Sequence, residues 1–157
     1  MKDIRRKEKA ISNINEIKDI IARTRFITVA MCADDNPYLV TITHGYDLNN
    51  DVIYFHCAQE GKKIDVLNRN NRVWGEALID YGYQKDKCDH LYASAHFKGT
   101  VSFIDDVDEK RKALEILIKH QEKNPSKVYN QQVNEESIRK VHIGKIKVEY
   151  LFGKKSI

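Results

Sequence analysis

Residues 54–65 read YFHCAQEGKKID, a pattern that predicts a strand running into a tight turn and then into the start of a helix. The free N–H groups and the dipole of such a helix start favour an anion, and Gly61 lets the backbone approach one closely. Lys62 and Lys63 add two cations at the same point. The stretch therefore predicts a seat for a phosphate group, although a solvated turn with two surface lysines fits the same residues.

The segments around this stretch are mostly typical of strands. They are rich in β-branched and aromatic residues, and short polar turns separate the first three of them. The six expected strands are FITVAMCA (26–33), PYLVTITHGY (37–46), DVIYFHCA (51–58), RVWGEALI (72–79), LYASAHFKGTVSFI (91–104) and VHIGKIKVEYLFG (141–153). Residues 80–90, DYGYQKDKCDH, are expected to form a loop between two of these strands.

Helical periodicity is confined to a few segments. Residues 13–24 place isoleucines at helical spacing, with Asn13 and Glu16 spaced as a capping box. Shorter helices are expected at 60–69 and 134–140, and a longer one from Asp106 to about His120 or Lys123. Because the parallel strand–helix–strand rhythm is missing, we predict an α+β fold, a mostly antiparallel six-stranded β-barrel with flanking helices.

Length and composition limit the classes of protein. The chain has 157 residues with 41% hydrophobic and 32% charged residues, which fits one soluble globular domain spanning 1–157. No run of apolar residues is long enough to span a bilayer, and the start lacks a secretory core, so no membrane association is expected. Cys32, Cys57 and Cys88 are widely spaced and form no CxxC pair, which favours a reducing cytoplasm and argues against structural zinc.

The net charge of +4 is concentrated in a basic start, residues 1–12, which we expect to be flexible. Nucleic-acid binding is not expected, since the other basic residues alternate with acidic ones and no basic face with interleaved aromatics is recognisable. A binder that uses the basic start is the least favoured alternative. It would show salt-dependent binding that is lost when residues 1–9 are removed.

The stretch GKKIDVLNRNNRVWGEA (61–77) resembles a signature of the flavin-binding split barrels related to pyridoxamine 5′-phosphate oxidase. In that signature a small-residue turn, Gly-Arg/Lys-Lys, a helix, Asn-Pro and a strand follow one another. More narrowly, residues 3–153 resemble the nitroimidazole-resistance branch, in which a basic start, a PYLVTITHGY strand, a YFHCAQEGKK turn and a later cysteine recur in this order. The resemblance implies a split β-barrel that binds FMN between the two protomers of a homodimer.

The resemblance also implies roles for particular positions. The FMN phosphate is held by Lys62 and Lys63 beside Gly61, with Lys62 a point charge where a bidentate arginine is frequent. The isoalloxazine edge and the strand that enters the turn are contacted by Val40, Thr41, Ile42, Thr43, His56, Cys57 and Ala58. Asn70-Asn71 replaces the common Asn-Pro, a departure that leaves the implied site intact.

His56 is the candidate catalytic residue. Reduction of a nitro or quinone acceptor needs protons as well as electrons, and imidazole exchanges protons near neutral pH. The competing interpretation is that His56 is a half-buried strand histidine bonded to a carbonyl. His44, which ends the preceding strand, lies next to His56 only in some strand registers. Cys57 alternates with His56 and is expected on the opposite face.

No metal site is expected. Cys88, Asp89, His90 and His96 form a loose group whose residue types suit a metal or a haem iron, but a loop and a strand explain them better.

Taken together, the sequence favours a cytoplasmic homodimeric flavoprotein, an oxidoreductase that passes electrons from NAD(P)H to a small acceptor, a nitroaromatic among the candidates. No G-x-G-x-x-G fingerprint is present, so a nicotinamide donor would bind transiently over the flavin. The alternative is a non-catalytic module that binds flavin or haem, because fold resemblance alone does not establish catalysis.

Overall fold

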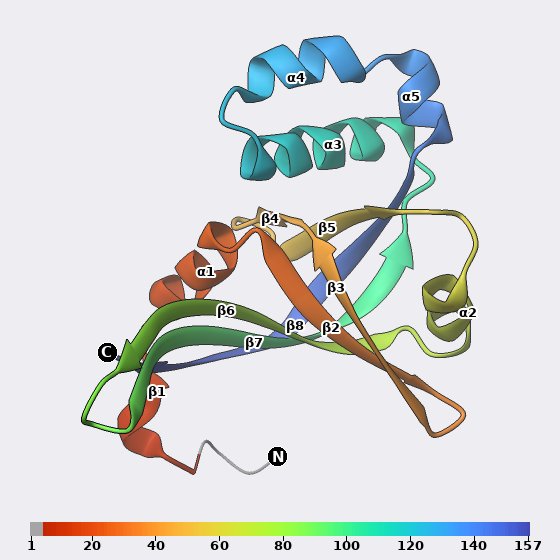
Figure 1. Ribbon diagram of the computed structural model, residues 1–157. Helices are drawn as coiled ribbons and strands as arrows, with labels where there is room; N and C mark the ends of the chain where they lie inside the picture. Colours follow the sequence, from red (N-terminus) through yellow and green to blue (C-terminus); the bar gives the residue numbers. More distant parts are fainter. Residues whose placement is uncertain (1–4) are drawn as a thin grey trace.

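The computed structural model describes residues 5–157 (Figure 1). The strands are β1 (Ala10–Ile11), β2 (Phe26–Ala33), β3 (Asn36–Thr43), β4 (Gly45–Asp47), β5 (Val52–Cys57), β6 (Arg72–Gln84), β7 (Asp89–Phe103) and β8 (His142–Ser156). The helices are the 3-10 helix η1 (Lys7–Lys9) and the α-helices α1 (Ile14–Arg23), α2 (Lys62–Arg69), α3 (Val107–Gln121), α4 (Pro125–Gln132) and α5 (Glu135–Lys140).

The strands form one antiparallel sheet in the order β3-β2-β6-β7-β8-β5-β4, with β1 paired to β8. The chain passes from one edge strand, β3, directly into the other, β4, through His44. The sheet therefore curls around its core without a hydrogen-bonded seam, and the expected α+β split barrel is confirmed (Figure 1).

Two features of the sequence explain why PYLVTITHGY is two strands rather than one. The His44 side chain is fully buried, and its Nε2 lies 3.1 Å from the Ile21 carbonyl oxygen at the end of α1. Gly45 lies so close to α3 that a Cβ there would be 2.9 Å from the Leu117 backbone. The chain turns at His44 because α1 and α3 both press on it there, and this break, together with β1, gives eight strands instead of the six expected.

The expected loop at residues 80–90 is wrong. β6 and β7 continue their pairing as far as Gln84 opposite Asp89, and only residues 85–88 turn. A bulge near Gly82, whose φ is +95°, bends β6, and His90 Nε2 lies 2.7 Å from Asp80 Oδ1 across the pair. The polar composition resembles a loop because this arm of the sheet is exposed on both faces.

Two helix starts also differ from the expectation. Asn13 caps α1 through the N–H of Asn15, but Glu16 forms an ion pair with Lys155 at 2.6 Å instead of completing a capping box. Residues 125–132, where no helix is expected, form α4; Pro125 opens it, and the Asn124 side chain accepts from the Lys127 N–H. Proline suits the first helical position because its missing N–H has no partner there.

The core lies inside the barrel. Ile17, Ile20 and Ile21 of α1 are buried against it. Two ring-on-glycine contacts fill the barrel: the Phe97 ring lies over Gly75, and the Phe55 ring lies over Gly144. A Cβ at either glycine would overlap the facing ring, so both glycines are needed for close approach.

A second, smaller cluster lies outside the barrel, where α3 covers β4 and β5 (Figure 1). Its buried members are Tyr54, Ile104, Ala113, Leu117 and Ile143. α4 and α5 continue from α3 on the same side of the molecule, and α4 contributes no buried residue.

The basic start is attached to the sheet where the structure describes it. Ile11 is buried, Ala10 pairs with Lys154, and Lys9 Nζ donates to Ser156 Oγ at 3.0 Å. Residues 1–4, the first part of the segment expected to be flexible, lie outside the described residues. Within residues 5–157 no helix has the length and apolar character needed to cross a membrane.

Candidate functional site

The turn between β5 and α2 leaves the start of α2 without a cap. Gly61 has φ +125° and ψ 169°, a conformation that suits glycine, and no side chain accepts the first N–H groups of the helix. A Cβ built on Gly61 would meet nothing within 4 Å, so the space beside it is open. The backbone N–H groups at the start of α2 therefore remain available for an anionic ligand.

The ammonium groups of the two lysines at the start of α2 approach aromatic rings on two strands, β3 and β5, that do not pair with each other. Lys62 Nζ is 4.8 Å from the ring centroid of Tyr38 on β3, and Lys63 Nζ is 5.5 Å from that of Phe55 on β5. Among the described residues, neither ammonium group pairs with a carboxylate. Both lysines belong to the first turn of the uncapped helix, and the phosphate seat at this point stays a prediction.

The four predicted flavin contacts on β3 divide between two faces. Val40 and Ile42 pack against the barrel core, whereas Thr41 is exposed and its hydroxyl lies 3.1 Å from that of Thr28. Thr43 is half-buried and lies opposite Phe26. β3 pairs only with β2 in the described structure, so its outer edge carries backbone groups open to a ligand.

His56 and Cys57 lie on opposite faces of β5, as their alternation predicts. Cys57 packs with the barrel core, and burial raises the pKa of its thiol while Lys63 opposes that shift. His56 is exposed on the other face and makes no side-chain hydrogen bond among the described residues. The competing interpretation of a half-buried histidine bonded to a carbonyl does not describe His56; it is the fully buried His44 that contacts a carbonyl, that of Ile21.

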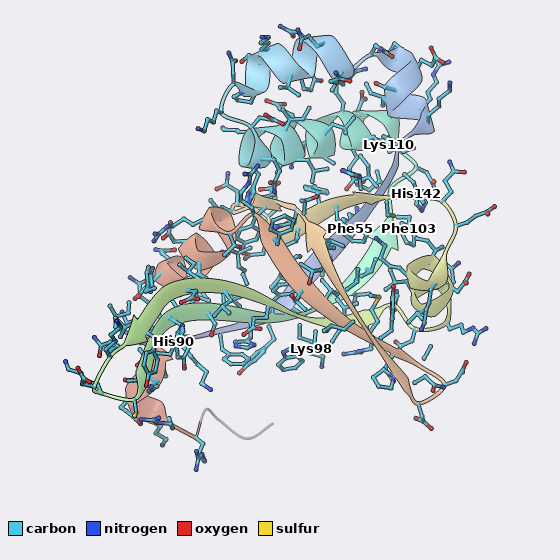
Figure 2. All side chains as sticks on the ribbon, viewed as in Figure 1. Phe55, His90, Lys98, Phe103, Lys110 and His142 are labelled. Atoms are coloured by element: carbon cyan, nitrogen blue, oxygen red, sulfur yellow. The ribbon has the colours of Figure 1, made fainter. Side chains whose placement is uncertain are left out.

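Ala58 follows Cys57 as the first residue of the turn, so the predicted contact group His56, Cys57 and Ala58 leads directly to Gly61. Within this group His142 is a neighbour that the sequence analysis missed. It lies opposite Cys57 on β8, and its ring stacks on Phe103 with centroids 4.5 Å apart (Figure 2). Only strand register reveals this neighbour, because 85 positions separate 57 from 142.

A cavity on the other side of Lys62 was also missed. It has a volume of about 250 Å³ and lies between the β2–β3 turn and α2. Arg69, at the end of α2, reaches Asp34 of that turn at 2.5 Å. The sequence does contain one signal for this cavity: Lys62, Asp65 and Arg69 have helical spacing and therefore share one face of α2.

The loose group of Cys88, Asp89, His90 and His96 does not form one site. His90 and His96 are six residues apart on β7, a separation of roughly 20 Å along a strand. His90 lies on the arm formed by β6 and β7, where it approaches Asp80 (Figure 2). His96 lies 3.3 Å from Glu76, and its ring stacks on Phe152 at 4.7 Å.

A row of mainly apolar side chains crosses the outer face of the barrel, beyond the part that α3 covers. Register places Leu39, Ala30, Trp74, Lys98 and Tyr150 side by side on five successive strands. Leu39 is 63% exposed, and Trp74 packs near Tyr150 and Phe152. Figure 2 shows Lys98 on this uncovered side. We call these five residues the outer row.

Comparisons with known proteins agree with the split-barrel fold. The sequence model of the family described as pyridoxamine 5′-phosphate oxidase matches residues 13–155. A candidate 5-nitroimidazole antibiotic resistance protein from Bacteroides thetaiotaomicron is similar, with a TM-score of 0.79 and 31% identity over 93% of this chain and 86% of that one. A search of curated proteins gave no match.

Two more distant structures share the fold. The flavocytochrome Anf3 from Azotobacter vinelandii has a TM-score of 0.81 and 14% identity over 98% of this chain and 72% of that one. An FAD and heme binding protein from Mycobacterium smegmatis has a TM-score of 0.77 and 17% identity over 94% and 73%. With the family match extending over nearly the whole chain and the Bacteroides structure 31% identical, this chain belongs to the pyridoxamine 5′-phosphate oxidase family of split barrels.

Proposed function

We propose that this chain binds a flavin through its 5′-phosphate at the start of α2 and passes electrons from NAD(P)H to a small acceptor, with nitroaromatics as the leading class. The observation that carries the proposal is the uncapped helix start at Gly61 with two lysines that lack carboxylate partners among the described residues. FMN is the smallest flavin that offers this phosphate. The Mycobacterium smegmatis and Azotobacter vinelandii relatives, described as flavin proteins, support the same cofactor class.

The phosphate is recognised by charge and by backbone donors together. The N–H groups of the first turn of α2 donate to the phosphate oxygens. The ammonium groups of Lys62, near Tyr38 of β3, and of Lys63, near Phe55 of β5, add positive charge beside it. Lysine is a flexible point charge, so the open backbone at Gly61 supplies the directional part of the recognition.

The bound flavin supplies the chemistry of accepting a hydride and releasing electrons. The protein orients it through the free edge of β3, where Thr41 and Thr43 present backbone groups and small side chains. His56 acts as the proton donor to the acceptor. Its ring is exposed and has no hydrogen-bond partner among the described residues, so it is free to move a proton between solvent and a reacting oxygen or nitrogen.

The proposed assembly is a homodimer that uses the outer row. An uncovered sheet face with Leu39, Trp74 and Tyr150 in one line is a patch that a soluble protein usually covers. A second copy of the chain related by a twofold axis covers it with the same residues, because such interfaces are self-complementary.

The proposal is tested by an absorption spectrum of the purified protein before and after incubation with FMN and desalting. Oxidised flavin bands at about 370 and 450 nm, bleached by NADH or NADPH and restored by a nitroaromatic, are expected. Flavin that neither donor reduces would leave a non-catalytic flavin module. A colourless protein that retains no flavin, or one that shows only a haem Soret band, would overturn the proposal.

A further inference from the structure

The cavity beside Lys62 holds charges of both signs. It has a volume of about 250 Å³, and Lys62 and Arg69 line it together with the carboxylates of Asp34 and Asp65. A lysine that is paired with a carboxylate must give up that partner before it binds a phosphate, which lowers its contribution to anion binding. The phosphate seat therefore depends on what keeps Lys62 from pairing with these two acidic neighbours.

Lys62 is held by an aromatic ring instead of a carboxylate. Its Nζ lies over the ring of Tyr38, 4.8 Å from the centroid, within the range of a cation–π contact. Tyr38 is half-buried and packs against the barrel core, so its ring has a fixed place. Among residues 5–157 no carboxylate oxygen lies within ion-pair distance of this ammonium group. The ring attracts the cation but carries no net charge, so the positive charge remains available to a ligand.

The two acidic neighbours are kept from Lys62 in different ways. Asp65 lies three residues after Lys62 on α2, a spacing at which the two side chains can reach each other, so the Tyr38 ring competes with it directly. The Asp34 carboxylate accepts from Arg69 Nη1 at 2.5 Å. Arg69 therefore occupies the second carboxylate that lines the cavity.

The β2–β3 turn fixes the place of that carboxylate. Asp34 and Asp35 have φ of 52° and 59°, the pair of positive values typical of a tight type I′ hairpin turn. Asn36 Nδ2 donates to the Asp34 carbonyl oxygen at 2.8 Å. The carboxylate of Asp34 is thus presented to α2 whether or not Arg69 is there to receive it, and Lys62 is the other cation that lines the cavity.

Lys63 repeats the arrangement. Its Nζ lies 5.5 Å from the ring centroid of Phe55, a buried residue of the barrel core. Both ammonium groups at the start of α2 are therefore directed by rings rather than by carboxylates.

We propose that Tyr38 and Arg69 are positioning residues of the phosphate seat. The Tyr38 ring holds the ammonium group of Lys62, and Arg69 holds the Asp34 carboxylate away from it, so that Lys62 meets the flavin phosphate without an ion-pair partner. The inference rests on the proposed flavin site and assigns two further residues to it, neither of which needs to touch the flavin.

The test compares FMN with riboflavin, which has the same ring system but no phosphate. The ratio of the two dissociation constants, from quenching of flavin fluorescence, measures the contribution of the phosphate alone. The natural chain is expected to favour FMN. Tyr38→Leu should lower this preference about threefold, and Tyr38→Phe, which keeps the ring, should retain it. Tyr92→Leu is the matched control, because Tyr92 is another half-buried tyrosine under a lysine, with Lys9 Nζ 5.7 Å from its ring.

Arg69 is tested by a rescue. Arg69→Gln frees the Asp34 carboxylate to pair with Lys62 and should also lower the preference for FMN about threefold. Adding Asp34→Asn removes the competing charge and should restore the preference, and asparagine suits the positive φ at this position. A direct contact between Arg69 and the ligand would not be restored in this way.

The outcomes separate this inference from the proposed function. An unchanged ratio in Tyr38→Leu, an equal loss of FMN and riboflavin in that variant, or a loss in Arg69→Gln that Asp34→Asn does not restore would overturn the positioning roles while the flavin site stands. Equal affinity of the natural chain for FMN and riboflavin would overturn the phosphate seat as well. Failure to bind either flavin would overturn the proposed function.

Discussion

His44 and His120 lie ring against ring, with centroids 4.4 Å apart, where α1, β4 and α3 meet. Each imidazole Nε2 contacts a carbonyl oxygen at the end of α1: that of Ile21 at 3.1 Å for His44, and that of Thr24 at 2.7 Å for His120. His44 Nδ1 is buried without a hydrogen-bond partner. The pair therefore connects α1 and α3 at the point where the chain passes from one edge strand, β3, to the other, β4.

This contact predicts acid sensitivity. Burial, and next the proximity of His120, lower the pKa of His44 to about 4. The unfolded chain binds the proton near the ordinary histidine pKa, so the stability present at pH 7 is lost as the pH falls from about 6.5 toward 4. From pH 7 to pH 5 the expected loss is about 2 kcal/mol, measured by urea unfolding. His44→Phe should flatten this dependence, and exposed His90→Gln should keep it. A natural chain equally stable at both pH values would contradict the assignment.

The phosphate seat predicts a loss of flavin on removal of its charges. Lys62→Ala combined with Lys63→Ala should weaken FMN binding about a hundredfold or more, since each hydrogen bond to a charged group contributes about 1.5–3 kcal/mol. The fold should be retained, because Lys62 is exposed, Lys63 is only half-buried and neither forms an ion pair among the described residues. Lys85→Ala combined with Lys87→Ala, in the β6–β7 turn, is the control. Unchanged flavin content in the first variant, measured by absorbance after desalting, would refute the seat.

The His56→Ala substitution should affect acceptor reduction and flavin binding differently. Loss of a positioned proton donor should slow acceptor reduction about a hundredfold at neutral pH, with FMN affinity unchanged within about twofold. Stopped-flow reoxidation of the reduced protein measures the step, and flavin titration measures binding. His142→Ala, across the strand pair on the opposite face, is the control for general damage to this end of the barrel. Equal reoxidation rates for His56→Ala and the natural chain would reduce His56 to a surface residue.

Gly61 and Gly82 form a matched pair for testing the turn. Both have positive φ, +125° and +95°, and both have open space where a Cβ would stand. Alanine at either position should cost about 1 kcal/mol of stability through backbone strain. Only Gly61→Ala should also weaken flavin binding, because only that strain moves the N–H groups of α2. If the two variants retained flavin equally, the backbone at Gly61 would have no role in recognition.

The outer row predicts the oligomeric state. Trp74→Glu places a charge in the middle of the proposed twofold interface and should convert a dimer into a monomer, as measured by light scattering after size exclusion. Leu48→Glu is the control, since Leu48 is 46% exposed and lies in the β4–β5 turn, outside the outer row. A monomeric natural chain would remove the basis for the dimer.

Much of this architecture can be predicted from local patterns. β-branched residues mark β2, β5 and β8, the isoleucines of 13–24 mark α1, and Gly61-Lys62-Lys63 marks the helix start that faces open space. Each of these signals is contained within a few neighbouring residues. Such local patterns are sufficient to predict an element where no distant contact overrides them.

The missed features depend on distant residues. His44 divides a continuous β pattern because α1 and α3 converge on it, and the β6–β7 arm is polar because both its faces are exposed. The cavity at Lys62 needs Asp34, which is 35 residues from Arg69 in sequence. The sequence shows the residue types of such contacts, but only the fold brings them together.

The ring of Phe55 lies on Gly144 and also contacts the ammonium group of Lys63, 5.5 Å from its centroid. A larger residue at position 144 would push the ring, and with it the lysine, although 81 positions separate 63 from 144. Positions 55 and 144 should therefore covary in evolution. A larger side chain at one of them requires a smaller side chain at the other if the ammonium group of Lys63 is to keep its position. Divergent members of the family offer a natural record in which this compensation can be sought.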